Sequence, residues 1–244
     1  MSRHFDIYVI NLDKDVSRLE EMTQALKPNH FTRIAGILGK DLDQGNAGGP
    51  SLDDVFYTSR FFAPRGAIGC SLSHRKALTT FLQTSKKEYA LILEDDAKPT
   101  TQDYVTEVQK AIENAPKDWG IIKLDSWPRY SSTEYTTLPS LLTTAYVINR
   151  SAAKKWLEYK SVFHIDMDMW FYNIKIYTCP TIVFQQVWDE KYTSNNRSID
   201  KVKYNPLAIL CDPLDGSFLR IGNFELTIAD LLVLLIVGVI YANI

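Results

Sequence analysis

Three adjacent acidic residues, Glu94, Asp95 and Asp96, directly follow the apolar run 90–93 of this chain. Neighbouring carboxylates repel one another and raise each other's pKa unless a positive group neutralises them, and a hard divalent cation is a common neutralising group in proteins. Acidic residues after a strand can also begin a solvated loop or cap the next helix. Taken alone, the triplet is therefore compatible with a metal site and with a surface loop.

A second polar group lies in the stretch "GCSLSHRK", where Ser73 and His74 are followed by the cations Arg75 and Lys76. Glycines and small residues precede it, and a helical pattern is expected from about Ser71, with Ser73 as a plausible cap. Hydrogen-bond donors near a helix start suit a diphosphate, because the free amides and the cations both favour negative charge. The alternative is that His74 is only a cap or a hydrogen-bond partner in the core.

The segments that must position these residues alternate between strand and helix patterns. The stretch 5–13, "FDIYVINLD", predicts a short buried strand, and 16–26 has helical spacing of Leu19, Met22 and Leu26. Further strands are expected at 89–96, 119–125 and 143–150, and further helices at 103–114 and 151–159, the last capped by Ser151. This alternation predicts an α/β sandwich with a largely parallel sheet, whose ligands bind beyond the carboxyl ends of the strands.

Composition limits the classes of protein that the chain can belong to. Its 244 residues, 45% of them hydrophobic, suffice for one large α/β domain or two small ones. A formal net charge of -2 offers no general attraction to nucleic acid, which we do not expect as a partner. Cys70, Cys179 and Cys211 are odd in number and lack C-x-x-C spacing, which argues against a disulfide framework or a zinc site.

The two ends of the chain differ in hydropathy. The N-terminal stretch shows no secretory signal pattern, because its apolar run covers only 7–10. The C-terminal stretch 226–244 is almost entirely apolar and has about the length of a membrane-spanning helix. A buried C-terminal helix is the alternative. We expect a tail-anchored membrane protein, with a catalytic domain over 1–220 in the cytosol and a single transmembrane segment at 226–244.

Five motifs in order, "IYVINLD" with Arg18, "FTRIAGILGKDL", "GAIGCSLSH", "ALILEDD" and "AYVINRSAA", resemble glycosyltransferase family 25. The resemblance covers about 7–168, and it implies a GT-A-like, Rossmann-type α/β sandwich that transfers a sugar from a nucleotide-sugar donor. By family analogy the donor is UDP-galactose or else UDP-glucose, and the acceptor is a glycan, glycolipid or protein hydroxyl. The family includes lipooligosaccharide and collagen galactosyltransferases.

The resemblance also assigns roles to the acidic triplet, as a version of the D-x-D metal motif that binds Mn²⁺ or Mg²⁺. In an extended stretch Glu94 and Asp96 face one side and Asp95 the other. We expect Asp96 to be the direct metal ligand, assisted by Glu94, while Glu94 or Asp95 holds the ribose or a metal-bound water. The histidines His4, His30, His74 and His164 include none near the C-terminus, where many such transferases place a further ligand.

The resemblance places a nucleoside beside Asn11, Asp13 and Arg18 at the end of the first strand. An amide or carboxylate can bind ribose hydroxyls or a base edge, and Arg18 can bind a phosphate. The alternative is that Arg18 only pairs with Asp13 or Asp15 on the surface.

Transfer with inversion needs a general base for the acceptor hydroxyl, and a carboxylate is the usual choice. The stretch "HIDMDMW" offers Asp166, our first choice, and Asp168. Trp170 could stack on a sugar face, although an aromatic residue in "MWFY" is more often part of the core.

One position departs from the family pattern, because Ala67 stands where the family usually has a glutamate before "IGC". This departure supports an alternative function, a membrane-anchored, transferase-like protein that binds a sugar or nucleotide without turnover. A metal-dependent phosphohydrolase would need a D-x-D-x-[TV] motif, which "EDDAKPT" does not match.

Overall fold

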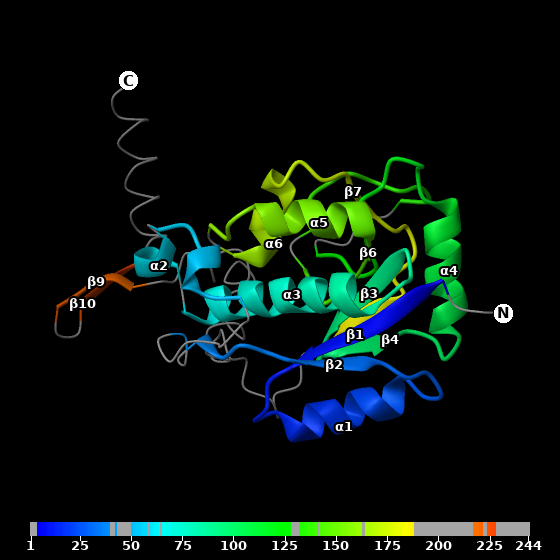
Figure 1. Cartoon of the computed structure of the whole chain (residues 1–244), viewed down its shortest axis with the longest axis horizontal. Helices are drawn as coiled ribbons and strands as arrows, with labels where there is room; N and C mark the ends of the chain where they lie inside the picture. The colour runs from blue at the N-terminus through cyan, green and yellow to red at the C-terminus, as the bar shows by residue number, and fades with distance from the viewer. Residues whose placement is uncertain are drawn as a thin grey trace.

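The computed structural model describes residues 4–39, 42, 50–57, 59–63, 65–127, 132–140, 142–162, 164–187, 217–221 and 224–227. Its main sheet has six strands in the order β2-β1-β3-β6-β5-β7 (Figure 1). Their bounds are β1 (Phe5–Asn11), β2 (Thr32–Ala35), β3 (Tyr89–Glu94), β5 (Ile121–Lys123), β6 (Ala145–Asn149) and β7 (Ile176–Thr178).

The sheet is mostly parallel, as the alternation of strand and helix patterns predicts. β1 pairs in parallel with β2 and β3, and β5 does so with β7. β6 is antiparallel to both of its neighbours, β3 and β5, which the sequence pattern did not predict. The described residues between β5 and β6 contain no helix, and an antiparallel neighbour needs no crossover helix.

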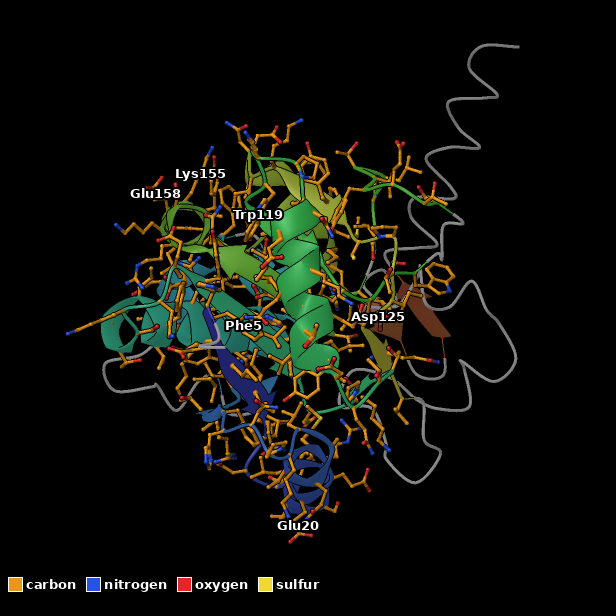
Figure 2. All side chains as sticks on the ribbon, turned by 90° about the vertical axis from the view of Figure 1, so that its right-hand side faces the viewer. Phe5, Glu20, Trp119, Asp125, Lys155 and Glu158 are labelled. Atoms are coloured by element: carbon orange, nitrogen blue, oxygen red, sulfur yellow. The ribbon has the colours of Figure 1, made fainter. Side chains whose placement is uncertain are left out.

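Helices cover both faces of the sheet. The longer ones are α1 (Val16–Ala25), α3 (Arg65–Thr84), α4 (Tyr104–Asn114) and α5 (Arg150–Glu158). The short elements are the 3₁₀-helices η2 (Leu52–Asp54) and η3 (Met169–Phe171), the helices α2 (Ser59–Phe62) and α6 (Ile165–Asp168), and two ribbons, β4 (Ala97–Pro99) with β8 (Phe184–Gln186) and β9 (Ser217–Ile221) with β10 (Phe224–Thr227). Figure 2 shows Lys155 and Glu158 of α5 and Glu20 of α1 at the periphery, while Phe5 lies beside α4 in this view.

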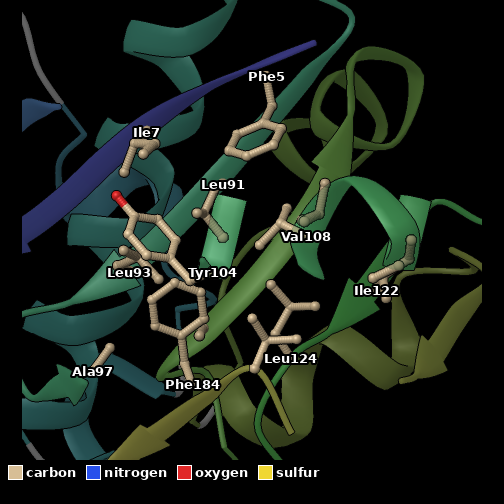
Figure 3. Close-up of a cluster of buried hydrophobic side chains, with 14 of the residues drawn as sticks. Phe5, Ile7, Leu91, Leu93, Ala97, Tyr104, Val108, Ile122, Leu124 and Phe184 are labelled. Carbon is tan, nitrogen blue, oxygen red and sulfur yellow. The ribbon is translucent and has the colours of Figure 1, made fainter. Parts of the chain in front are cut away.

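Two apolar clusters lie on opposite faces of the sheet, because successive strand residues point to opposite sides. Leu91 and Leu93 of β3 pack with residues of α1 and α4, including Val108 (Figure 3). The alternate residue Ile92 packs on the other face with residues of α3 and α5, including Trp156. The two clusters fix β3 from both sides, and the acidic triplet continues directly from its end.

Two predicted helix starts are wrong. α3 begins at Arg65, well before Ser71, although its first turns contain glycines. A Cβ at Gly69 would lie 2.5 Å from the Ile37 carbonyl oxygen, so the glycine allows the helix to approach the loop after β2. α5 begins at Arg150, and its cap is Asn149, whose side-chain oxygen accepts a bond of 2.8 Å from the Ala152 amide.

The predicted C-terminal helix lies outside the described residues for almost its whole length. Of the apolar segment 226–244, the structure describes only Leu226 and Thr227, which end β10. None of the helices in the described ranges combines the length and the apolar composition that crossing a bilayer requires. Cys70 and Cys179 are free thiols, and Cys211 lies outside the described residues.

Candidate active site

Asn11 and the acidic triplet, among the predicted site residues, lie at the edge of the sheet where β1, β3 and β5 end. Register places Ile10 of β1 beside Glu94 of β3, so the following residues of both strands lie next to one another. β6 runs the other way and begins at this edge, where the Glu94 amide donates to the Thr144 carbonyl at 2.9 Å. Lys123 ends β5 at the same edge. The acidic triplet therefore lies beyond the carboxyl ends of parallel strands, as expected.

Asp95 connects the ends of β1 and β3 to helix α1. Its carboxylate accepts a hydrogen bond of 2.8 Å from the side-chain amide of Asn11 and forms an ion pair of 3.0 Å with Arg18. Burial raises the pKa of Asp95, although Arg18 and Asn11 act in the opposite direction. Arg18 is thus paired with a residue of the triplet, a partner that neither interpretation of the sequence named.

Arg33 of β2 joins this group, and sequence reasoning missed it. Its Nε donates to the Asn11 side-chain oxygen at 3.0 Å, and its guanidinium forms a salt bridge with Asp13. The side chain of Asp13 is 80% exposed, so its carboxylate remains open to solvent. Arg33 lies in the motif "FTRIAG", but only the pairing of β2 with β1 reveals that it faces Asn11.

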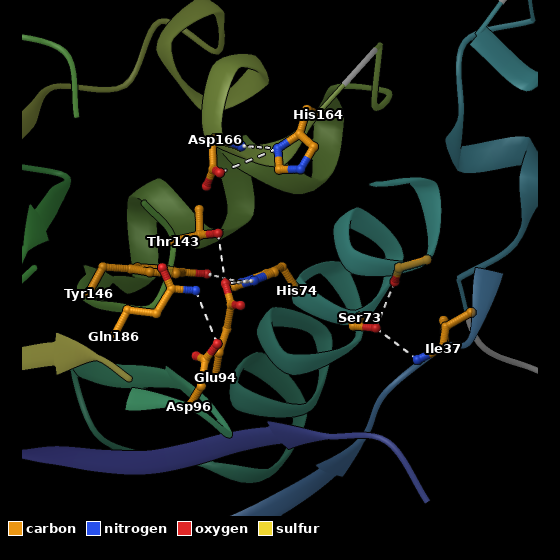
Figure 4. A network of polar contacts seen from close by, with 11 residues as sticks. Ile37, Ser73, His74, Glu94, Asp96, Thr143, Tyr146, His164, Asp166 and Gln186 are labelled. Atoms are coloured by element: carbon orange, nitrogen blue, oxygen red, sulfur yellow. Dashed lines mark hydrogen bonds and ion pairs between the residues drawn. The ribbon is translucent and has the colours of Figure 1, made fainter. Parts of the chain in front are cut away.

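Glu94 points to the other side of the strand and contacts His74 (Figure 4). Its Oε1 lies 3.3 Å from His74 Nε2 and accepts a bond of 2.8 Å from the Thr143 hydroxyl. His74 Nδ1 lies 2.9 Å from the Tyr146 hydroxyl, which fixes the ring from behind. Burial opposes ionisation of Glu94, but the bonds from His74 and Thr143 and the charge of His74 lower its pKa.

Asp96 lies near Glu94 (Figure 4), as expected, although Asp95 and Asp96 form a turn after β3 rather than an extended stretch. Gln186 of β8 donates to its Oδ2 at 3.0 Å, and the Val187 amide donates to its carbonyl at 2.9 Å. The other oxygen, Oδ1, is buried and has no hydrogen-bond partner among the described residues. Burial, together with the charges of Glu94 and Asp95, raises the pKa of Asp96 to about 7.

The two acidic residues of α6 have different surroundings. Asp168 is buried, and its Oδ2 accepts bonds of 2.9 Å from the Ser161 hydroxyl and 2.8 Å from the Val162 amide. Asp166 has its Oδ2 3.4 Å from His164 Nδ1, while its Oδ1 is buried without a partner in the described part of the chain. Asp168 therefore holds residues 161–162 in place before α6, whereas Asp166 Oδ1 accepts no hydrogen bond from the described residues.

Lys123 is a fully buried cation beside these acids, and the sequence analysis did not select it. Its Nζ donates to the Ser140 carbonyl at 2.6 Å and lies 5.8 Å from the centre of the Trp170 ring. Burial lowers the pKa of Lys123 to about 8, although Asp166 and Glu94 act in the opposite direction. Trp170 Nε1 bonds to the same carbonyl at 3.3 Å. A lone lysine within the apolar stretch "GIIKLD" was the available signal.

The proposed diphosphate cluster at Ser73 does not form. The Ser73 hydroxyl is buried, donates to the Gly69 carbonyl and accepts from the Ile37 amide, both at 2.7 Å. Arg75 binds Asp54 and carbonyls at the C-terminal end of α5, and Lys76 binds a carbonyl of β2. These residues lie within α3, which begins at Arg65, so no helix-end amides are available beside them. Only His74 of this group reaches the acidic triplet.

The family model described as Glycosyltransferase family 25 (LPS biosynthesis protein) matches residues 4–141, more than half of the chain. No curated protein sequence gives a significant match to the whole chain. The matched segment contains β1 to β5 and all three residues of the acidic triplet.

Several solved structures are similar to this chain at low sequence identity. A Drosophila β1,4-galactosyltransferase 7 mutant in complex with manganese, UDP-Gal and xylobiose is 10% identical, with a TM-score of 0.40 over 80% of this chain and 76% of that one. A glycosyltransferase involved in glycosylation of the major capsid of PBCV-1 is 10% identical, with a TM-score of 0.34 over 62% and 65%. Mouse xyloside xylosyltransferase 1 in its apo form is 11% identical, with a TM-score of 0.36 over 70% and 69%.

Proposed function

The chain belongs to glycosyltransferase family 25, and from that premise we propose that it moves a hexose from a UDP-sugar to a hydroxyl group of a glycan, glycolipid or protein. UDP-galactose is the first candidate donor and UDP-glucose the second. The observation that carries the mechanism is a pair of buried carboxylate oxygens, Asp96 Oδ1 and Asp166 Oδ1, that have no partner among the residues the structure describes. A transferase needs acidic groups for two tasks, at the leaving diphosphate and at the acceptor hydroxyl.

The residues around Asp96 fit a hard divalent cation, Mn²⁺ or Mg²⁺. Asp96 offers an oxygen that no other described group occupies, and Glu94 lies on the same side of the chain. The pKa of Asp96 is raised to about 7 because its negative charge lacks compensation in a buried place. A divalent cation bound there would neutralise the charge that develops on the leaving diphosphate. We assign Asp96 as its direct ligand and Glu94 as the second.

The group around Asn11 supports a nucleoside site. Asp13 keeps an exposed carboxylate that can accept bonds from ribose hydroxyls or a base edge. Asn11 is held by Asp95 and Arg33 in one orientation, which prepares the end of β1 for a ligand. Arg18 and Asp95 are engaged with each other and act by fixing this end of the sheet rather than by binding phosphate.

Asp166 is the better candidate for the general base. The carboxylate of Asp168 is committed to Ser161 and Val162, whereas Asp166 retains a free acceptor oxygen near the same network. His164 approaches the other oxygen of Asp166 and orients the carboxylate. A single base without a nucleophile partner implies inversion, so a UDP-α-sugar should give a β-linked product. Nuclear magnetic resonance of the product tests this, and an α-linkage would contradict it.

The proposed activity is tested by release of UDP from UDP-galactose and UDP-glucose by the purified full chain, with Mn²⁺ or with a chelator. We expect metal-dependent turnover that Asp96→Asn abolishes, while the matched variant Glu113→Gln, at an exposed position of α4, retains it. Full activity of Asp96→Asn would refute the metal assignment. Absence of turnover with every nucleotide sugar would refute the transferase mechanism.

Ala67 supports a second candidate function, because this residue is buried in α3 where the family usually has a glutamate. In that case the protein binds a nucleotide sugar without transferring it. Thermal stabilisation by a nucleotide sugar, combined with no release of UDP, would favour this function, since a ligand of the folded state raises the midpoint by mass action.

A further inference from the structure

Three different metal-ligand atoms lie close together at the end of β3, and they belong to Cys70, His74 and Glu94. The cysteine sulfur, an imidazole nitrogen and a carboxylate oxygen all lie within 4.8 Å of one another. Cys70 and His74 are four residues apart on α3, so they lie on one face one turn apart, and Glu94 reaches them from the end of β3. The C-x-x-C rule applied to the sequence could not detect this set, because its members come from two elements.

A neighbouring hydroxyl group contacts each of the other two ligands, His74 and Glu94. The Tyr146 hydroxyl contacts His74 Nδ1 at 2.9 Å, and the two rings stack at 5.7 Å, which leaves Nε2 directed at Glu94. The Thr143 hydroxyl holds Glu94 Oε1 at 2.8 Å. Metal sites use such partners to orient their histidine and carboxylate ligands.

The separations agree with a tetrahedral zinc site. Ligands about 2.0 to 2.1 Å from zinc lie roughly 3.3 Å apart in a tetrahedron, and His74 Nε2 is 3.3 Å from Glu94 Oε1. The sulfur must approach to roughly 3.6 Å from the other two atoms, which all lie within 4.8 Å of one another, so it moves by about 1.2 Å at most. Burial and the charges of Glu94, Asp166 and Asp96 raise the pKa of the Cys70 thiol, and a bound dication reverses this effect.

We propose that Cys70, His74 and Glu94 form a binding site for a thiophilic divalent cation, Zn²⁺. Its sulfur and nitrogen ligands distinguish it from the all-oxygen site at Asp96, because Mn²⁺ and Mg²⁺ prefer oxygen ligands. Zinc binds here with displacement of the Cys70 proton to solvent.

The site has a consequence for activity that rests on the proposed function. Glu94 cannot serve both cations in full, so zinc in the sulfur site withdraws a ligand from the metal at Asp96. Zn²⁺ therefore inhibits donor turnover supported by Mn²⁺, and Cys70→Ser reduces the sensitivity to zinc at least tenfold.

The binding itself is tested without donor or acceptor, by titrating the full chain with Cd²⁺ and following the ultraviolet thiolate-to-metal charge-transfer band. The double variant Cys179→Ser/Cys211→Ser leaves Cys70 as the sole thiol of the chain. We expect this variant to show the band at one equivalent of Cd²⁺, and its further change Cys70→Ser to abolish it. Absence of the band in the double variant, or its persistence after Cys70→Ser, would overturn the proposal.

A second measurement avoids any change in the core of α3. In the same double variant, alkylation of Cys70 followed by mass spectrometry should slow at least tenfold with Zn²⁺ and remain unchanged with Mg²⁺. Equal rates with both cations would also overturn the site. A positive titration together with an inactive protein would retain the zinc site and reject the proposed function, so the two failures are distinguishable.

Discussion

Asp96→Asn should make the protein more stable at neutral and alkaline pH, although it removes a central site residue. The carboxylate of Asp96 is buried with one oxygen unpartnered, and its pKa rises from 3.8 to about 7 on folding. A folded-state pKa above the unfolded value means that folding takes up a proton between these two pH values. The resulting stability is fully present below about pH 4 and is lost as the pH rises to about 7.

The size of the effect follows from the same two values. Their difference corresponds to about 4 kcal/mol above about pH 7, and to a much smaller free energy near pH 5. The amide of the variant carries no charge and keeps an oxygen for the bond from Gln186. The variant should thus exceed the native chain in unfolding free energy by about 4 kcal/mol near pH 8 and by much less near pH 5.

Urea unfolding of both proteins at these two pH values, in the presence of a chelator, measures the difference. Glu113→Gln is the matched control, because its side chain is exposed on α4, and it should change stability equally little at both pH values. Mn²⁺ should stabilise the native chain near pH 8 and leave the Asp96→Asn variant unchanged. A variant less stable than the native chain near pH 8, or an advantage independent of pH, would refute the reasoning.

Three further predictions concern α6, α3 and the C-terminal segment. Asp166→Asn should lower turnover with little loss of donor binding, whereas Asp168→Asn should lower the unfolding free energy by about 1 to 3 kcal/mol, because it weakens two buried hydrogen bonds. Turnover lost in Asp168→Asn alone, without loss of stability, would show that the base is misassigned. Gly69→Ala should lower the thermal midpoint of unfolding, because its Cβ would lie 2.5 Å from the Ile37 carbonyl oxygen. Ala77→Gly is the control for an exchange of glycine and alanine within α3. An unchanged midpoint of Gly69→Ala would contradict the close packing. The apolar segment 226–244 predicts that the protein resists carbonate extraction from membranes, and its release would show that this segment is not an anchor.

The local sequence pattern predicted a feature correctly where that feature depends on a single helix or strand. Helix α4, expected at 103–114, spans Tyr104–Asn114, and β1 and β3 lie within their predicted stretches. The split of the triplet does not follow from the two-residue period of an extended chain, because Asp95 and Asp96 form a turn after β3, and Asp95 is held by Asn11 and Arg18. The start of α3 was missed because the glycines that suggested a loop are needed for close packing against Ile37.

Partners that arrive from distant parts of the chain could not be predicted. Gln186 binds Asp96 across 90 positions, and Arg33 meets Asn11 only because β2 pairs with β1. Lys123 gave a signal only as a charge in an apolar strand, and its place beside Asp166 depends on the arrangement of β5 and α6. The sequence therefore identified the acidic residues of the site, but not the groups that shift their pKa values.

The central position of β6 limits how segments could be exchanged between members of this family. The stretch 4–141 that matches the family model ends before β6, yet β6 lies between β3 and β5 in the sheet. A fragment cut at that boundary would leave β3 with a bare hydrogen-bonding edge and β5 without the neighbour that joins it to the sheet, a state prone to aggregation. A chimera joined there would need the incoming half to match the antiparallel register of Leu93 with Ala145. A junction after Val187 instead keeps the whole sheet and the Gln186 bond to Asp96 within one parent.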